Sequence, residues 1–209
     1  MLFVKTPVLI MKLFPELIWH FSSRENRHEN HVYLTFDDGP TPEVTPWVLD
    51  NLREYEAKGT FFCLGRNVDR YPEIYQQILD EGHGVGNHTY SHLKGSHTSN
   101  SEYINDIKLA GWDIESKLFR PPYGRFRKSQ IRELRKDYKI VMWDVLSQDY
   151  DQKINPEKCF SNIKENIRPG SIIVFHDSLK ARDNLYHALP AMLEQYSDKF
   201  RFLPIPESA

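Results

Sequence analysis

The sequence predicts an α/β fold, built as a distorted or incomplete (β/α) barrel, and three observations support this prediction. From residue 31 onward, short apolar runs rich in β-forming residues alternate with longer stretches of helical periodicity, as in β/α units around a mostly parallel sheet. The chain has 209 residues and 40% hydrophobic content, enough for one sizeable core. A complete eight-unit barrel takes about 250 residues, so a shortened barrel is expected, with an open doubly wound sheet as the alternative.

The expected strands and helices follow one another in order along the chain. The first strand is HVYLTF (31–36), after which Pro42 opens a helix whose apolar face carries Val44, Trp47, Val48, Leu52 and Tyr55. TFFCLG (60–65) is the second strand, and a helix from Pro72 to the stop signal Gly82 leads to a short strand at 83–88. Further helices are expected at 101–117, 128–137, 156–167 and 183–197, and further strands at 118–121, 138–145, 171–176 and 200–203.

Residues 31–209 are therefore expected to form a single domain, and residues 1–30 an N-terminal segment that packs on it. Pro7, Lys12, Pro15 and Glu16 interrupt the apolar runs of this segment, so no signal-peptide core and no bilayer-spanning stretch is visible. Its apolar residues follow amphipathic-helix spacing, namely Ile10, Leu13, Phe14, Leu17, Ile18 and Phe21. Packing is favoured over a membrane-surface helix because the polar face lacks a Lys and Arg cluster. The compartment stays open: cytoplasmic by default, with envelope association as the alternative.

The charge balance and the cysteines exclude some classes of protein. Lys and Arg number 27 and Asp and Glu number 29, so the chain lacks the basic field of a nucleic-acid-binding protein. Cys63 and Cys159 lie in apolar surroundings and are expected to be buried thiols. No feature of the sequence calls for a protein partner, and a monomer is expected.

Residues suited to catalysis fall at the predicted ends of several strands. They are Asp37 and Asp38, His88 and His92, Arg120, Asp149, and His176 with Asp177. In parallel β/α folds the active site lies at the carboxyl ends of the strands, so these side chains are expected around one opening. Each has a plainer interpretation as a turn residue, a cap or a surface charge.

Two of these clusters together indicate a metal-dependent hydrolase. His88 and His92 are spaced i, i+4, which can aim two imidazoles at one metal ion, and a carboxylate would complete a three-ligand site. A hydrolytic site also needs a separate base for the attacking water. Of the adjacent Asp37 and Asp38, one can bind the metal ion and the other can act as this base. The same ligand set occurs in non-haem iron oxygenases, but those usually have all-β folds.

Five segments, TFDDGP, HTYSH, RPPYG, WDVLSQDY and IIVFHD, resemble in this order the five motifs of the polysaccharide deacetylase family. This family is also called the NodB-homology family or carbohydrate esterase family 4, and the resemblance spans about residues 31 to 177. It implies a distorted or incomplete (β/α) barrel of the NodB-homology type, with residues 31–209 as the catalytic domain.

The resemblance also implies a role for each site residue. Asp37 would be the catalytic base, held by Arg120, and His176 the general acid, tuned by Asp149. Asp38, His88 and His92 would bind a divalent metal, usually Zn²⁺, with Co²⁺ or Ni²⁺ as alternatives. The residues that would bind the substrate are Tyr123, whose backbone N–H would stabilise the oxyanion, and Pro122, Trp143 and Val174.

The implied reaction removes N-acetyl groups from a glycan that contains N-acetylglucosamine, such as peptidoglycan or a chitin-like polymer, and releases acetate. Two positions depart from the family pattern: Leu146 stands where an Asp is usual, and Tyr150 where a Trp is usual. A changed sugar pocket with catalysis retained is expected. The alternatives are an O-acetyl xylan esterase of the same family, a sugar-binding pseudoenzyme, and an unrelated metal-dependent amidohydrolase.

Overall fold

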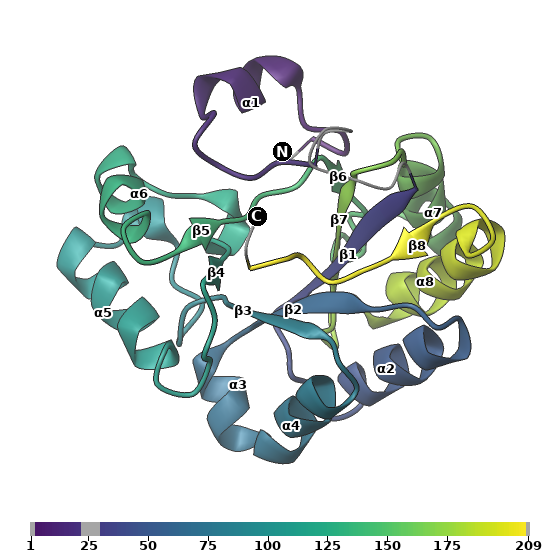
Figure 1. Ribbon diagram of the computed structural model, residues 1–209, viewed down its shortest axis with the longest axis horizontal. Helices are drawn as coiled ribbons and strands as arrows, with labels where there is room; N and C mark the ends of the chain where they lie inside the picture. Colours follow the sequence, from purple (N-terminus) through teal and green to yellow (C-terminus); the bar gives the residue numbers. More distant parts are fainter. Residues whose placement is uncertain (1–2, 22–29, 208–209) are drawn as a thin grey trace.

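A computed structural model describes residues 3–21 and 30–207 of the chain, and it shows a curled parallel sheet with helices around it (Figure 1). Seven strands follow one another across the sheet in the order β5-β4-β3-β2-β1-β7-β6, and β8 pairs with β1. Every pairing between these strands is parallel. Their bounds are β1 His31–Asp37, β2 Gly59–Cys63, β3 Gly84–Asn87, β4 Leu118–Phe119, β5 Lys139–Ile140, β6 Val145–Leu146, β7 Ile172–His176 and β8 Arg201–Phe202. The expected incomplete barrel is confirmed.

The helices lie outside the sheet and form an outer ring in Figure 1. They are α1 Val8–Leu13, α2 Thr45–Glu54, α3 Gly65–Arg70, α4 Pro72–Asp80, α5 Asn100–Ala110, α6 Lys128–Leu134, α7 Pro156–Lys164 and α8 Arg182–Tyr196. None of them, in the described part of the chain, combines the length and hydropathy that a bilayer crossing requires.

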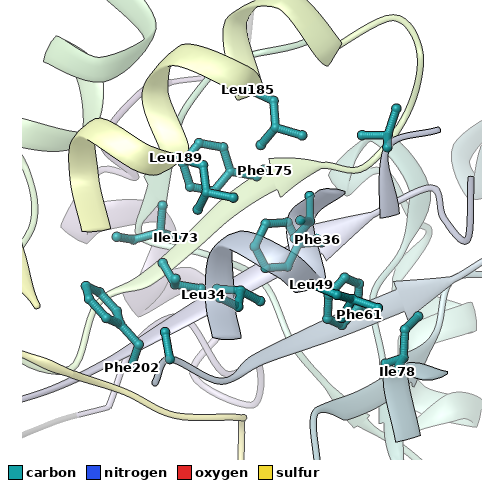
Figure 2. Close-up of a cluster of buried hydrophobic side chains, with 14 of the residues drawn as sticks. Leu34, Phe36, Leu49, Phe61, Ile78, Ile173, Phe175, Leu185, Leu189 and Phe202 are labelled. Atoms are coloured by element: carbon teal, nitrogen blue, oxygen red, sulfur yellow. The ribbon is translucent and has the colours of Figure 1, made fainter. Parts of the chain in front are cut away.

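Alternation along β1 places its two kinds of side chain on opposite faces of the sheet. Leu34 and Phe36 point outward into a core cluster, where the Phe36 ring stacks on Phe61 and Phe175 with centroids 4.9 and 5.9 Å apart. Figure 2 shows these strand residues meeting side chains of α2 and α8. Since successive side chains of a strand alternate, Thr35 and Asp37 face the interior of the curled sheet. The hydrophobic pattern of β1 therefore aims Asp37 inward.

The N-terminal segment lies along the gap between the two edge strands, β5 and β6. On one side Lys5 bridges to Val145 in antiparallel fashion, and on the other Ile18 bridges to Val141 in parallel. Between these bridges the chain forms the short helix α1, and after it Leu17 and Trp19 are buried in the interior core cluster. The segment thus takes the place of the strands that would complete the barrel.

Several elements differ from expectation. The helix expected at 101–117 is shorter, because α5 ends at Ala110. The first helix begins at Thr45 rather than at Pro42, because Pro46 takes its first turn and the Thr45 hydroxyl accepts the Thr41 N–H at 2.7 Å. The amphipathic helix expected over residues 10–21 is limited to α1. A helix not foreseen, α3, follows β2.

The expected strand at 138–145 is divided into β5, which pairs with β4, and β6, which pairs with β7, and the side chain of Arg120 binds the segment between them. Its guanidinium donates hydrogen bonds to the carbonyls of Val141 and Met142, at 3.2 and 3.0 Å. These carbonyls are therefore used by a side chain instead of a neighbouring strand. The interrupted segment therefore lies in contact with Arg120, one of the candidate site residues.

Candidate active site

The carboxyl ends of the strands surround a cavity of about 530 Å³. Its lining includes eight of the residues selected from the sequence: Asp37, Asp38, His88, His92, Tyr123, Trp143, Val174 and His176. Arg120 and Asp149 lie behind this lining and are fully buried. Pro122 is also buried, and its neighbour Pro121 lines the cavity instead.

Asp37 is held by Arg120 at the end of β1. Arg120 Nη1 donates to Asp37 Oδ1 and to Thr35 Oγ1, each at 2.7 Å. The guanidinium also lies 4.1 Å from the centre of the Phe62 ring. Burial lowers the pKa of Arg120, and the charge and hydrogen bond of Asp37 act in the opposite direction. The hydrogen bond from Nη1 therefore fixes the orientation of the Asp37 carboxylate.

Asp38 leaves the strand, which explains how two adjacent aspartates serve one cavity. Its φ of 84° ends the extended conformation of β1, so the alternation of faces no longer applies. Asn67 Nδ2 donates to the Asp38 carbonyl at 2.8 Å. On the next residue, the Gly39 N–H donates to Asp177 Oδ1 at 3.0 Å. The turn that carries Asp38 is therefore tied to two other parts of the chain.

The two histidines of HTYSH lie on a tight turn after β3, not on a helix as their spacing would allow. Thr89 and His92 both have positive φ, and the His92 N–H donates to Thr89 Oγ1 at 2.9 Å. From α5, Asp106 Oδ2 accepts the N–H groups of Tyr90 and Ser91 at 2.9 and 3.0 Å. This turn brings both imidazoles to the Asp38 carboxylate.

Asp38, His88 and His92 form a group that could hold a metal ion. One ligand atom from each lies within 4.8 Å of the others. His88 Nδ1 is 2.8 Å from the Arg120 carbonyl and donates to it, so the lone pair of Nε2 faces Asp38. Burial lowers the pKa of His88 to about 4, which keeps its imidazole neutral.

The chemistry of these three residues fits a divalent cation. Asp38 Oδ1 is 3.6 Å from His88 Nε2 and 3.0 Å from His92 Nε2. This oxygen is buried and accepts no hydrogen bond among the described residues. Burial raises the pKa of Asp38, but the close contact with His92 and the charges of His176 and His88 lower it well below its usual range. One carboxylate and two imidazoles are a ligand set that Zn²⁺ commonly takes.

His176, at the end of β7, is paired with Asp149. His176 Nδ1 lies 2.8 Å from Asp149 Oδ1, and the His176 backbone N–H donates to Asp149 Oδ2 at 2.7 Å. Asn184 Nδ2 in turn donates to the Asp149 carbonyl at 2.9 Å. Burial alone would lower the pKa of His176, but the charge and hydrogen bond of Asp149 outweigh it and raise this pKa to about 9.

The remaining lining of the cavity is largely aromatic and aliphatic. Tyr123 is half-exposed, has a φ of 60°, and its ring lies 4.6 Å from the His92 ring. Trp143, Leu146 and Val174 are buried in the wall. On the side of His176, the Tyr150 ring lies edge-on to the imidazole, 5.0 Å away. The wall thus offers an apolar surface next to the polar groups.

Three residues to which the sequence interpretation assigns no role fix the geometry of the site. Thr35 shares Nη1 of Arg120 with Asp37, Asp106 holds the HTYSH turn, and Asp177 holds the turn after β1. The sequence groups Asp177 with His176 among the residues suited to catalysis but assigns it no role; in the structure it is fully buried and accepts the Thr45 hydroxyl at 2.6 Å. A signal for Thr35 was present, because strand alternation puts it on the same face as Asp37.

Three comparisons with known proteins agree with this geometry. The polysaccharide deacetylase family model matches residues 24–143, more than half of the chain. A peptidoglycan-N-acetylglucosamine deacetylase of Bacillus cereus is 37% identical over 190 residues, covering 86% of this chain and 88% of that protein. A chitooligosaccharide deacetylase of Azorhizobium caulinodans is 35% identical, covering 75% of this chain and 78% of that protein.

Solved structures show the same architecture. The crystal structure of the Bc1960 peptidoglycan N-acetylglucosamine deacetylase superimposes with a TM-score of 0.83 at 30% identity. The match covers 96% of this chain and 95% of that one. Together with the family match and the identity to curated deacetylases, this shows that the chain belongs to the polysaccharide deacetylase family, the NodB-homology or carbohydrate esterase family 4.

Proposed function

We propose that this polysaccharide deacetylase is a metal-dependent enzyme that removes N-acetyl groups from N-acetylglucosamine residues of a glycan. The observation that carries the proposal is the division between two adjacent aspartates. Asp37 is bound to Arg120, while Asp38 lies against His88 and His92. This division supports a role as base for Asp37 and a role as metal ligand for Asp38.

Asp38, His88 and His92 would hold the metal, which we propose to be Zn²⁺. When bound there, a divalent cation supplies Lewis-acid polarisation of the acetyl carbonyl and lowers the pKa of the attacking water. Co²⁺ and Ni²⁺ are alternatives that suit imidazole ligands.

Asp37 would take the proton from the attacking water. Its carboxylate lines the cavity, and Arg120 holds it in one orientation through the hydrogen bond at Nη1. Because Arg120 is itself fixed by the carbonyls of Val141 and Met142, the base is held in place from behind. Catalytic groups act best when their own supports are rigid.

His176 would donate a proton to the departing amine. Asp149 accepts the Nδ1–H, so the Nε2 of the same ring carries the proton that can be transferred. A pKa of about 9 keeps the ring protonated at neutral pH. The carbon–nitrogen bond of the acetamide breaks with this transfer, and the products are acetate and a free glucosamine amine.

The wall of the cavity supports a substrate with an acetyl group. Trp143, Leu146 and Val174 form an apolar surface that a methyl group can contact. Leu146, in place of the usual aspartate, makes this wall more apolar. The named relatives at 35–37% identity act on N-acetylglucosamine polymers or oligomers, which favours this sugar.

The test is acetate release from three substrates: N-acetylglucosamine oligomers, peptidoglycan and acetylated xylan. Chelator-treated protein is assayed before and after addition of Zn²⁺, with His187→Ala as a control because His187 is exposed on α8. The proposal predicts release from one of the first two substrates, only with metal, in wild type and control. Release from xylan alone would assign an O-acetyl esterase, and release from none would assign a pseudoenzyme.

A further inference from the structure

The outward face of α1 is apolar, whereas a surface helix normally turns polar residues to water. Three of its side chains are strongly exposed: Val8 at 61%, Leu9 at 70% and Leu13 at 64%. Phe3, which precedes the helix, is 57% exposed. Four large apolar side chains thus face solvent within eleven residues, a grouping that in soluble proteins marks an interaction site.

The opposite face of α1 is packed against the domain, so the outward face is not free to turn inward. Ile10, Met11 and Phe14 pack on the interior core cluster. The Phe14 ring meets the Phe126 ring edge-on at 5.6 Å, and the Phe14 carbonyl accepts a hydrogen bond from Trp19 Nε1 at 3.0 Å. With both ends bridged to the sheet edges, the segment is anchored in this orientation.

Basic side chains of α6 border this apolar face. Leu13 and Phe14 share a shallow depression with Lys128, Arg132 and Arg135, all exposed, and Glu16 is the acidic residue in its lining. Lys128 Nζ lies 5.9 Å from the centre of the Phe14 ring. On α1 itself, Lys12 is exposed between Leu9 and Leu13. The region is therefore locally positive in a chain whose net charge is −2.

We propose that Phe3, Val8, Leu9 and Leu13, with Lys12, Lys128, Arg132 and Arg135, form a docking surface for an anionic phospholipid bilayer. Exposed apolar side chains next to cations are what interfacial helices present to a membrane: the apolar groups enter the acyl boundary and the cations meet the headgroup phosphates. The Lys and Arg cluster that the N-terminal sequence lacks is supplied by α6, which is distant in sequence. This inference does not depend on the reaction that the site performs.

The same segment lies close to the active-site cavity. Phe3, Phe14 and Trp19 line a second cavity of about 300 Å³, and Gly124 and Trp143 line both cavities. A bilayer bound at α1 would therefore have the active site beside its surface. Docking would favour glycans that are held near a membrane.

The test is sedimentation of the 209-residue chain with vesicles. One set contains phosphatidylcholine alone, and the other contains equal amounts of phosphatidylcholine and phosphatidylglycerol. Binding is expected only to the second set, and it is expected to weaken as salt is added. Leu9→Asp with Leu13→Asp should abolish binding, and each of Lys128→Gln, Arg132→Gln and Arg135→Gln should weaken it about fivefold.

Matched controls come from exposed apolar residues elsewhere. Leu109 is 43% exposed and Trp112 is 85% exposed, so Leu109→Asp and Trp112→Asp should leave vesicle binding unchanged. Thermal melting of every variant tests whether it folds. Absence of binding to either vesicle, equal binding to both, or full binding by the Leu9→Asp, Leu13→Asp variant would overturn the proposal. A wild-type dimer that this variant converts to monomer would assign the face to a second copy of the chain instead.

Discussion

Arg120 donates a hydrogen bond of 2.7 Å from Nη1 to Asp37 Oδ1, from a position where its own side chain has no exposed surface. The other guanidinium nitrogens are bound to the carbonyls of Val141 and Met142. One buried cation thus binds both the Asp37 carboxylate and the segment between β5 and β6.

Arg120→Lys is expected to lower kcat/KM about 100-fold, because lysine keeps the charge but cannot bind Asp37 and both carbonyls at once. Arg120→Met leaves the Asp37 charge unpaired and should lower the free energy of unfolding by about 3–5 kcal/mol. Steady-state kinetics and urea unfolding measure the two effects. Arg182→Lys, at an exposed site on α8, is the control. Normal activity in Arg120→Lys would show that the planar guanidinium, with its several N–H donors, is not required.

The pairing of His176 with Asp149 predicts a pH dependence. With a pKa raised to about 9, His176 is protonated below that pH, so kcat/KM should hold up to about pH 9 and fall above it. In Asp149→Asn, burial still lowers this pKa and the largest opposing charge is gone, leaving only the smaller effects of Asp38 and Asp37 to raise it. The alkaline fall should then move toward pH 6.5 or below, the ordinary histidine value being 6.5. As a control, His187→Asn should leave the pH profile unchanged. If the alkaline fall in kcat/KM does not move in Asp149→Asn, His176 is not the group whose deprotonation causes that fall.

Asp177 and Gly39 are predicted to be energetically coupled. A Cβ placed on Gly39 would overlap the Asp177 carboxylate, which accepts the Gly39 N–H and the Thr45 hydroxyl. Gly39→Ala should therefore destabilise the wild type more than it destabilises Asp177→Ala. A double-mutant cycle by urea unfolding should give a coupling of about 1–3 kcal/mol. Additive effects would mean that the turn after β1 is not held by this carboxylate.

Trp19 is predicted to stabilise the domain although it lies in the N-terminal segment. Its side chain is 7% exposed and packs in the interior core cluster between β5 and β6. Trp19→Ala should lower the free energy of unfolding by about 3–5 kcal/mol. Trp112→Ala, at a site 85% exposed, should change it little. Equal effects of the two substitutions on urea unfolding would show that the segment does not belong to the folded core.

Much of the fold could be predicted because hydrophobic periodicity records which face of each element is buried. The bounds of β1 and β7 match the apolar runs that predicted them to within one residue at either end. The strand β2 begins one residue before its predicted run and ends inside it. The break at residues 141–144 could not be predicted in this way. YKIVMWDV has the composition of one strand, but its two ends pair with different strands and its middle carbonyls accept hydrogen bonds from Arg120, some twenty residues earlier in the chain.

The grouping of Asp37, Asp38, His88, His92, Arg120 and His176 at strand ends was likewise visible in the sequence, because parallel strands bring their carboxyl ends together. The backbone conformation of the site was not visible in the sequence. The positive φ angles of Asp38, Thr89 and His92 belong to turns whose hydrogen bonds come from Asn67, Asp106 and Asp177. Periodicity carries no information about such contacts, since they join loops that are far apart in sequence.

The most direct test of the central claim compares Asp37→Asn with Asp38→Asn, two equal changes at adjacent residues. Bound Zn²⁺ is measured by elemental analysis after dialysis, and acetate release is measured from an N-acetylglucosamine oligomer or peptidoglycan that the wild type deacetylates. The division of roles predicts that Asp37→Asn keeps its zinc and loses activity, whereas Asp38→Asn loses both. Two results would contradict this division of roles. One is that Asp37→Asn loses its zinc while Asp38→Asn retains it, and the other is that Asp37→Asn has normal activity.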